Sequence, residues 1–498
     1  MCCGNPPRAA TVYPATRNGN RIIVRRLLTS LLCLVLAAPA AAEPLRLPEM
    51  GDPASLALSE SEERALGDAI MEELRRKLPM EQDPQISGYL SDLGRRLASR
   101  VYTEQELRFF VVDDPAINAF ALPGGYIGIN TGLILNAGSE SELASVVAHE
   151  IAHVSQRHIA RRIAAAENST WRTAALLTAA ILIGSQSPQA GSAAAMAGVA
   201  GSIQQQLNYS RQHEQEADRV GMRILADAGL DPRGMPRFFE RLLQQSRYQD
   251  RPPEYLSTHP VTESRVSDTR ARADSQPRGD IFENDDFQLM RARLAALKAQ
   301  RGQRAAREFR ARLAEAEGLR AHALRYGLAL LLIREGEHAE AEGLLRQLLD
   351  EHGERAAYFA ALGELKRAAG DTAQSLAHYR EGLSLYPDDA GLGVGYARSL
   401  EAAGRSEQAW KQLEQLHRRQ PLQADTLRDL ARLADAAGHP VDARLAMARH
   451  YYMGGDLRAA LTQLDAVLNS AEADRYQKER AAAYREQWRR AAERARDS

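Results

Sequence analysis

The residues best suited to chemistry form a His-Glu-x-x-His motif at positions 149–153. On a helix, His149 and His153 project from one face, close enough to hold one Zn²⁺ ion. Glu150 would then lie beside the metal, where its carboxylate can deprotonate an activated water and pass the proton to a leaving amine. The apolar residues 146–148 argue against an exposed helix with two ordinary histidines. The motif therefore predicts a zinc-dependent hydrolytic centre with one metal ion per chain.

A catalytic zinc site needs a third protein ligand and an open position for water. Glu214 and Asp218 stand four residues apart in a helix-like segment, a spacing that alone is typical of a solvated helix face. Together with the motif at 149–153, however, this pair resembles the M48 metallopeptidases, which join His-Glu-x-x-His to a downstream Glu-x-x-x-Asp helix. The resemblance implies that Glu214 is the third metal ligand. It also implies that Asp218 either orients a ligating histidine or acts as a proton donor.

A second segment extends the resemblance. Residues 256–260, which contain His259 followed by proline, precede Glu263 and Arg265 and are similar to a loop of periplasmic M48 proteins that carry tetratricopeptide repeats. In that subgroup the loop histidine can bind the metal and exclude water. The resemblance implies that His259 is a fourth ligand, which must leave before catalysis. The alternative interpretation of a His-Pro pair is an ordinary loop.

Three polar residues near these motifs are not expected to bind the metal. Glu216 would face away from the site, and His213 is merely adjacent to Glu214. His158 lies nine residues past His149, which on a continuous helix turns it away from the metal face. We therefore expect His158 on the surface.

The motif at 149–153 requires a helix, and the flanking residues predict one. Ser139 and Glu142 have the spacing of a capping box, which places the helix start just before Leu143, and the apolar pattern continues through Arg162. Upstream, strands are predicted at 108–112 and, around a Pro-Gly-Gly turn, within 118–129. By resemblance, the 118–129 segment is an edge strand beside the cleft, where substrate can add as a further strand. Amphipathic helices are predicted over residues 59–77, 84–99 and 205–225.

A repeat with a period of 34 residues occupies the C-terminal part of the chain. Four glycines stand 34 residues apart, each followed five positions later by a small residue: Gly336 and Ala341, Gly370 and Ser375, Gly404 and Ala409, Gly438 and Ala443. Paired helices with this period resemble the tetratricopeptide repeat. The glycine permits a tight turn after the first helix, and the small residue permits close packing of the second. The unit beginning at Gly454 is irregular.

The N-terminus carries export signals. Three arginines at 21–26 precede an apolar run at 27–38, and three alanines precede Glu43, a pattern typical of a cleavable signal peptide. The alternative is an uncleaved anchor. All three cysteines lie before residue 34, so cleavage would leave a chain with neither a disulfide framework nor a cysteine nucleophile.

These observations predict a mainly α protein, with a zincin-like metalloprotease domain containing a small β-sheet and, after it, an α-solenoid of tetratricopeptide repeats. The predicted boundaries are 1–42 for the signal peptide with its N-terminal extension, 43–275 for the protease domain and 287–490 for the repeats. Residues 171–207 contain two short apolar halves, which predict either a helical hairpin over a cleft or a peripheral membrane contact. With 64 basic and 65 acidic residues, the chain lacks the positive field of a general nucleic-acid binder.

The sequence therefore predicts a zinc-dependent endopeptidase of the periplasm. The resemblance implies unfolded or stalled outer-membrane proteins as substrates and the outer-membrane beta-barrel assembly machinery as partner, with the repeats selecting substrate or docking that partner. The rival hypothesis is a periplasmic chaperone or assembly adaptor whose zinc site is structural. The presence of Glu150 weighs against this rival, because a purely structural site needs no general base.

Overall fold

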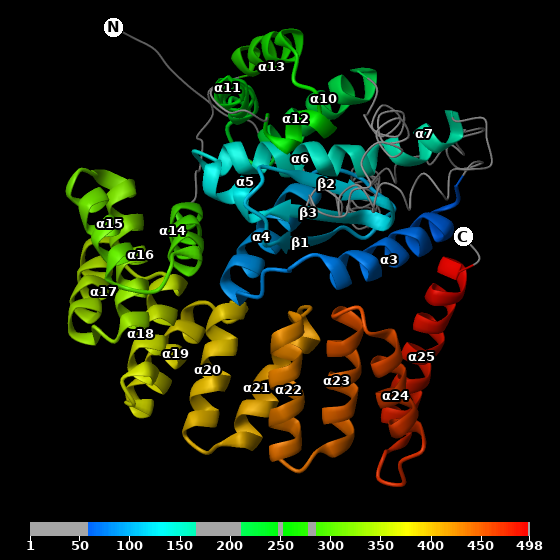
Figure 1. Cartoon of the computed structure of the whole chain (residues 1–498), viewed down its shortest axis with the longest axis vertical. Helices are drawn as coiled ribbons and strands as arrows, with labels where there is room; N and C mark the ends of the chain where they lie inside the picture. Colours follow the sequence, from blue (N-terminus) through cyan, green and yellow to red (C-terminus); the bar gives the residue numbers. More distant parts are fainter. Residues whose placement is uncertain (1–57, 166–210, 248–251, 277–284, 497–498) are drawn as a thin grey trace, which may run out of the picture. The chain divides into compact units, whose positions relative to one another are not determined.

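The computed structural model describes residues 58–165, 211–247, 252–276 and 285–496 (Figure 1). These residues belong to one compact unit. The predicted signal peptide and the apolar segment 171–207 lie outside the described residues. None of the described helices is long and apolar enough to cross a bilayer.

A three-stranded sheet forms one layer of the N-terminal part. Its strands are β1 (Arg108–Val112), β2 (Ala119–Leu122) and β3 (Tyr126–Asn130), in the order β1–β3–β2. β3 is the central strand and pairs in parallel with β1 and antiparallel with β2. The Pro-Gly-Gly turn is η1 (Pro123–Gly125), where Gly124 and Gly125 have φ of 75° and 82°. Of the two strands predicted within 118–129, β2 therefore lies at the sheet edge and β3 does not.

Helix α6 (Glu140–Ser155) lies between this sheet and a group of helices on its other side (Figure 1). It contacts β2 and β3 on the one hand and α10 and α11 on the other, and all its residues from 140 to 154 are buried. The metal-binding motif thus sits in the middle of the core. The other helices of this part are α3 (Glu60–Lys77), α4 (Pro84–Ala98), α5 (Thr131–Asn136), α7 (His158–Ala165), α10 (Arg211–Asp227), α11 (Gly234–Ser246), α12 (Glu254–Thr258) and α13 (Glu263–Ser275).

Antiparallel helix pairs make up the C-terminal part. The four glycines of the 34-residue period end the first helix of successive pairs, with φ between 72° and 84°, and the small residues that follow them are buried. The mainly α class with a small sheet is confirmed. The helices are α14 (Asp286–Lys298), α15 (Gln303–Ala314), α16 (Gly318–Glu335), α17 (His338–His352), α18 (Ala356–Ala368), α19 (Thr372–Leu385), α20 (Ala390–Ala402), α21 (Ser406–Arg419), α22 (Ala424–Ala436), α23 (Pro440–Met453), α24 (Leu457–Leu468) and α25 (Arg475–Arg496).

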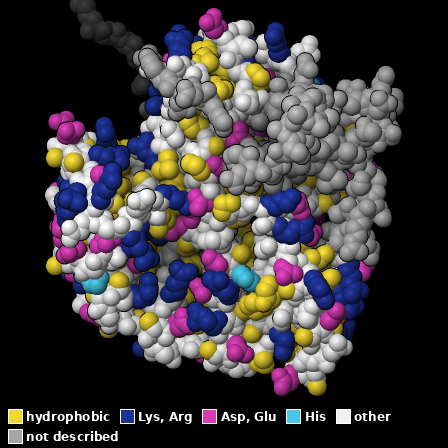
Figure 2. Space-filling view, viewed as in Figure 1, with side chains coloured by type: hydrophobic (Ala, Val, Ile, Leu, Met, Phe, Trp, Pro, Cys, Tyr) yellow, Lys and Arg dark blue, Asp and Glu magenta, His cyan; other side chains and the backbone are white. Residues whose placement is uncertain are grey.

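Helix α4 connects these two parts. Asp83 caps its N-terminus and also accepts two hydrogen bonds, of 2.9 and 2.7 Å, from the guanidinium of Arg293 on α14. α4 also contacts α20, while α3 contacts α23 and α25. Figure 2 shows basic and acidic side chains interspersed over the repeat helices on the face in view. The repeats therefore pack directly against helices of the N-terminal part, and the predicted boundaries at 275 and 287 remain predictions.

Candidate metal centre

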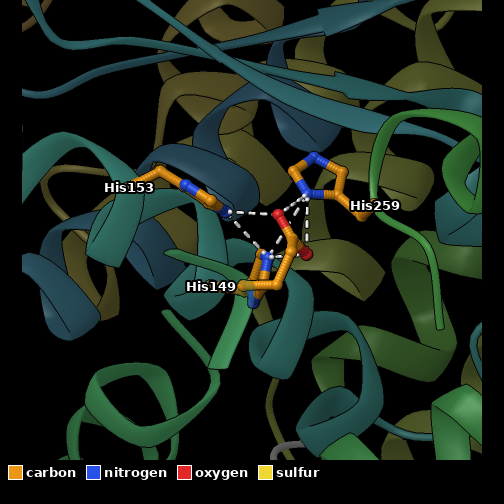
Figure 3. A group of neighbouring side chains, drawn as sticks. His149, His153 and His259 are labelled. Atoms are coloured by element: carbon orange, nitrogen blue, oxygen red, sulfur yellow. Dashed lines mark hydrogen bonds and ion pairs between the residues drawn. The ribbon is translucent and has the colours of Figure 1, made fainter. Parts of the chain in front are cut away.

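Four side chains from separate segments meet in one buried cluster. His149 and His153 come from α6, Glu214 from α10, and His259 from the residue that ends α12. One nitrogen or oxygen atom of each lies within 4.8 Å of the others, and every member is at most 2% exposed. Figure 3 shows the three imidazole rings facing one another. The structure thus brings together all four residues predicted to bind the metal.

The donor atoms of this cluster fit a metal ion. The Nε2 atoms of His149 and His153 lie 2.9 Å apart. Oε1 of Glu214 lies 3.4 Å from Nε2 of His153 and 3.1 Å from Nδ1 of His259. Three imidazole nitrogens and a carboxylate oxygen, gathered away from water, are a donor set that suits zinc and other divalent transition metals.

Close packing of α10 on α6 sets the place of Glu214. Gly221 lies two turns beyond Glu214, and a Cβ atom at Gly221 would come within 3.2 Å of the backbone nitrogen of His149. A glycine there lets the two helix backbones approach closely. At the other helix, Ser139 accepts a hydrogen bond from the amide of Glu142 and caps α6. The helix begins at Glu140, slightly earlier than the start predicted just before Leu143. His149, His153 and Glu214 are therefore held by regular helix, whereas His259 follows the end of the short helix α12.

Glu150 lies next to the cluster and is fully buried. Its Oε1 atom is 3.4 Å from Nε2 of His259, and neither carboxylate oxygen has a hydrogen-bond partner of normal geometry among the described residues. Burial raises the pKa of the Glu150 carboxyl, against the opposing effect of His259 and His149. A buried carboxylate with free acceptor capacity and a raised pKa is suited to take up a proton.

Asp218 and Arg265 lie behind His149. Oδ1 of Asp218 is 3.0 Å from Nδ1 of His149, and both carboxylate oxygens accept 2.7 Å hydrogen bonds from Arg265. Arg265 also reaches Oε2 of Glu214 at 2.8 Å and donates to the carbonyl of Pro260 at 2.8 Å. One buried guanidinium thus contacts two carboxylates of the site and the residue after His259.

The electrostatics of the cluster differ from histidine to histidine. Burial alone would lower the pKa of His149, but Asp218 and Glu214 outweigh it and raise that pKa to about 9. Burial holds the pKa of His153 well below its usual range. Burial would raise the pKa of Glu214, yet the surrounding histidines keep it well below the ordinary value. Glu214 is therefore an ionised carboxylate, as a metal ligand must be.

Comparison with known proteins shows the family to which this arrangement belongs. A family model described as Peptidase family M48 matches residues 84–273. A Vibrio cholerae protein with the provisional name beta-barrel assembly-enhancing protease is 41% identical over 343 residues, which are 68% of this chain and 71% of that protein. The chain belongs to peptidase family M48.

Two further relatives bear on the enzyme class of this M48 protein. The beta-barrel assembly-enhancing protease of Escherichia coli K12 is 38% identical over 314 residues, which are 63% of this chain and 64% of that protein. The mitochondrial metalloendopeptidase OMA1 of Arabidopsis thaliana is 35% identical over 155 residues, 31% of this chain and 29% of that protein. The family and these relatives make the chain a metalloendopeptidase. The chain spans just under two thirds of the length of the Escherichia coli relative.

Solved structures add little to this M48 assignment. The tetratricopeptide-repeat protein YrrB is matched at 16% identity with a TM-score of 0.26, over 36% of this chain and 91% of that one. The repeats are shown by the helix pairs and glycine turns of this chain itself.

The prediction that His158 lies on the surface is wrong. The helix predicted to run through Arg162 ends at Ser155, and Arg157 adopts a positive φ of 51° before α7 begins at His158. This break turns His158 inward, where it is fully buried and its Nδ1 lies 2.9 Å from Nδ1 of His153. The positive φ of a non-glycine residue is not readable from the sequence, so the helical periodicity was extended too far.

Glu216 and His213 are outside the M48 metal cluster, yet both touch His158. Oε2 of Glu216 is 3.2 Å from Nε2 of His158 and 3.1 Å from Arg161. The ring of His213 stacks on that of His158, with centroids 4.5 Å apart. Glu216 is thus outside the candidate cluster, and its contact with His158 was not predicted.

Proposed function

We propose that this M48 chain is a zinc-dependent endopeptidase of the periplasm that degrades or assists misfolded or stalled outer-membrane proteins. One observation carries the catalytic part of the proposal. His149, His153 and Glu214 present their donor atoms to one point, with the carboxylate of Glu150 buried beside them. This is the arrangement that metal-assisted peptide hydrolysis needs.

His149, His153 and Glu214 would hold the zinc ion. When bound, the ion supplies a Lewis acid that polarises the scissile carbonyl and lowers the pKa of water. Glu150 accepts the proton of the attacking water and returns it to the leaving amine, a role for which its raised pKa suits it. Asp218 fixes the ring of His149 through the 3.0 Å contact at Nδ1; proton donation by Asp218 is the alternative.

Strand β2 is the proposed docking edge for substrate. It contacts α6, the helix of the metal motif, and among the described residues no strand pairs with its other side. A substrate chain that adds there would form main-chain hydrogen bonds irrespective of its sequence. Such a mode suits a peptidase that acts on unfolded β-strand proteins.

His259 is the proposed regulator of the site. Its Nδ1 lies 3.4 Å from Nε2 of His149, and its Nε2 lies 3.4 Å from Oε1 of Glu150. A fourth protein ligand at this position closes the metal to water and crowds the general base. We infer that the segment around His259 moves before peptide is cleaved.

The repeat helices are the proposed docking surface for substrate or partner. A cavity of about 500 Å³ lies between α4, α14, α18 and the start of α20, lined by tyrosines and by charges of both signs. Two relatives are named for beta-barrel assembly, which supports outer-membrane proteins as substrates and the beta-barrel assembly machinery as partner. The periplasmic location further requires that residues 1–42 act as a signal peptide.

A periplasmic chaperone or assembly adaptor is the second candidate function. The observation that favours it is the closed set of four ligands, since structural zinc sites are closed. The buried carboxylate of Glu150 favours the peptidase, because a structural site has no use for a base.

One cleavage assay separates these functions. The full-length mature chain, with Glu150→Gln and His259→Ala variants, is incubated with an unfolded outer-membrane β-barrel protein, and fragments are followed over time. We expect Glu150→Gln to lose at least about 100-fold in rate while keeping its zinc. Glu263→Gln, which changes an exposed glutamate, is the matched control and should cleave normally.

Each outcome bears on a separate part of the proposal. Cleavage by Glu150→Gln at the wild-type rate would rule out the hydrolytic mechanism. We expect His259→Ala to cleave faster than wild type, and an unchanged rate would remove the regulatory role of His259.

A further inference from the structure

A series of polar contacts leads away from the candidate metal cluster through His153. The Nε2 atom of His153 faces the cluster, and its Nδ1 faces Nδ1 of His158 at 2.9 Å. The other ring nitrogen of His158 faces Oε2 of Glu216 at 3.2 Å. His158 is fully buried, whereas the side chain of Glu216 is 30% exposed. The contacts therefore run from the core to the protein surface.

The positions of the protons along this chain follow from the distances. A metal at Nε2 of His153 takes the lone pair there, so the proton of a neutral ring stands on Nδ1. Two ring nitrogens 2.9 Å apart need one donor and one acceptor, so Nδ1 of His158 accepts. The proton of His158 then stands on Nε2, where it donates to the carboxylate of Glu216. Every hydrogen-bond donor in these His153–His158–Glu216 contacts meets an acceptor. Glu216 is the only one of the three side chains that must carry a charge.

We propose that His158 is a positioning residue of the peptidase, which fixes the tautomer and the ring orientation of His153 through the His153–His158–Glu216 chain. A metal-bound histidine whose second nitrogen donates to an acceptor is a stronger and better-oriented ligand. His158 supplies that acceptor for His153, and Glu216 holds His158 in the accepting form. The inference rests on the proposed metal site.

The fold holds His158 in this place by several contacts. The turn at Arg157 that points His158 inward is fixed by a 2.7 Å hydrogen bond from Arg157 to the carbonyl of Leu58. The ring of His213 stacks on one face of His158, and Arg161 holds Glu216 at 3.1 Å. Buried polar groups are generally hydrogen-bonded, and both ring nitrogens of His158 have partners in the fold. What singles out His158 is that one of these partners is His153.

Zinc affinity in competition with a chromophoric chelator tests the role of His158. The full-length mature chain is compared with His158→Leu, His158→Asn and Glu216→Leu. We expect about 10- to 100-fold weaker zinc binding for His158→Leu, the usual effect of losing a group behind a metal ligand. The amide oxygen of asparagine takes the place of Nδ1, so His158→Asn should stay within about threefold of wild type. His378→Leu, which alters a half-buried histidine of the repeats, is the control and should bind zinc normally.

A second readout is the visible absorption spectrum of the cobalt-substituted chain, because it reports ligand geometry without any activity. We expect the bands to shift in His158→Leu and to return toward wild type in His158→Asn. Unchanged affinity and spectrum in His158→Leu would overturn the inference. Equal losses in the leucine and asparagine variants would also overturn it, since they would show that the ring merely fills space.

Two further results keep this test independent of protein folding and of the proposed function. If His158→Leu fails to fold, Glu216→Leu decides, because leucine has no acceptor for Nε2 of His158: we expect a few-fold weaker zinc binding, and wild-type affinity would contradict the proposed role of the His153–His158–Glu216 contacts. If wild-type chain binds no zinc, the proposed function itself fails. If the wild-type protein binds zinc and cleaves substrate, and the His158 variants bind zinc equally tightly, only the proposed role of His158 fails.

Discussion

His149 and His153 stand one turn apart on the same helix, yet the groups behind their second ring nitrogens differ. Behind His149 lies the carboxylate of Asp218, which is 2% exposed and held by the buried guanidinium of Arg265. Behind His153 lies a neutral imidazole, and the carboxylate of Glu216 comes only after it, at the surface.

This difference shows how one helix can orient two metal ligands without burying two uncompensated charges. The buried carboxylates of Asp218 and Glu214 require Arg265 as their counter-charge, because an unpaired charge in the core is costly. On the His153 side, His158 lies between His153 and the carboxylate of Glu216, which is partly exposed to water. We therefore expect the His149 side to contribute mainly to stability and both sides to contribute to metal affinity.

The largest effect should come from removing the buried counter-charge. Arg265→Met removes the guanidinium that contacts both Asp218 and Glu214, and we expect about 3–5 kcal/mol less free energy of unfolding in the zinc-free chain. Arg161→Met removes the corresponding partner of Glu216 at the surface and should cost less than about 1 kcal/mol. Urea unfolding of both variants measures the contrast. Equal losses would show that the two sides do not differ as described.

A smaller effect is expected on zinc affinity when the carboxylates are neutralised. Asp218→Asn should weaken binding by about 10- to 100-fold, because the oxygen that faces His149 loses its charge. Glu216→Gln acts one residue further from the metal and should weaken it less. Chelator competition gives both values, and a larger loss for Glu216→Gln would reverse the proposed order.

Asp218→Asn also separates the two roles left open for this residue. If Asp218 only orients His149, cleavage at saturating zinc should stay close to wild type. A large loss of turnover in the fully zinc-loaded variant would instead identify Asp218 as a proton donor.

The smallest effect on zinc binding is expected for a buried arginine–carboxylate pair that lies outside the metal site, Asp83 and Arg293. Burial would raise the pKa of Asp83, but Arg293 and the amides at the start of α4 outweigh it and lower that pKa below the ordinary 3.8. A carboxyl with a lowered folded pKa stabilises the chain above about pH 4 and loses that contribution as the pH falls through the folded value. Asp83→Asn should therefore flatten the decline of stability below pH 4 and leave zinc affinity unchanged. A change in zinc affinity would show that α4 and the site are coupled.

The sequence was sufficient for features set by local periodicity and by motif spacing. Ser139 begins α6, the 34-residue glycines end helices in the left-handed conformation, and His149 and His153 share a helical face. Each of these depends on residues a few positions apart. Glu214 and His259 could be associated with the motif only through resemblance, since nothing local shows that distant segments meet.

The features that the sequence did not reveal depend on tertiary contacts. Arg157 has a positive φ, and its guanidinium donates a hydrogen bond to the carbonyl of Leu58, 99 residues earlier in the chain. That turn determines where His158 points. The periodicity of α6 therefore could not predict the direction of this side chain. Likewise, Arg265 was noted as part of a motif, but its contacts with both Asp218 and Glu214 require α13 to pack against α10.

We propose above that His149, His153, Glu214 and His259 hold one zinc ion. X-ray absorption at the zinc edge of the purified full-length mature chain tests it most directly, because it reports the kind and number of ligand atoms. We predict a shell of nitrogen and oxygen ligands near 2.0 Å, with the scattering of three imidazoles. A shell with fewer than three imidazoles, or one containing sulfur, would contradict the claim.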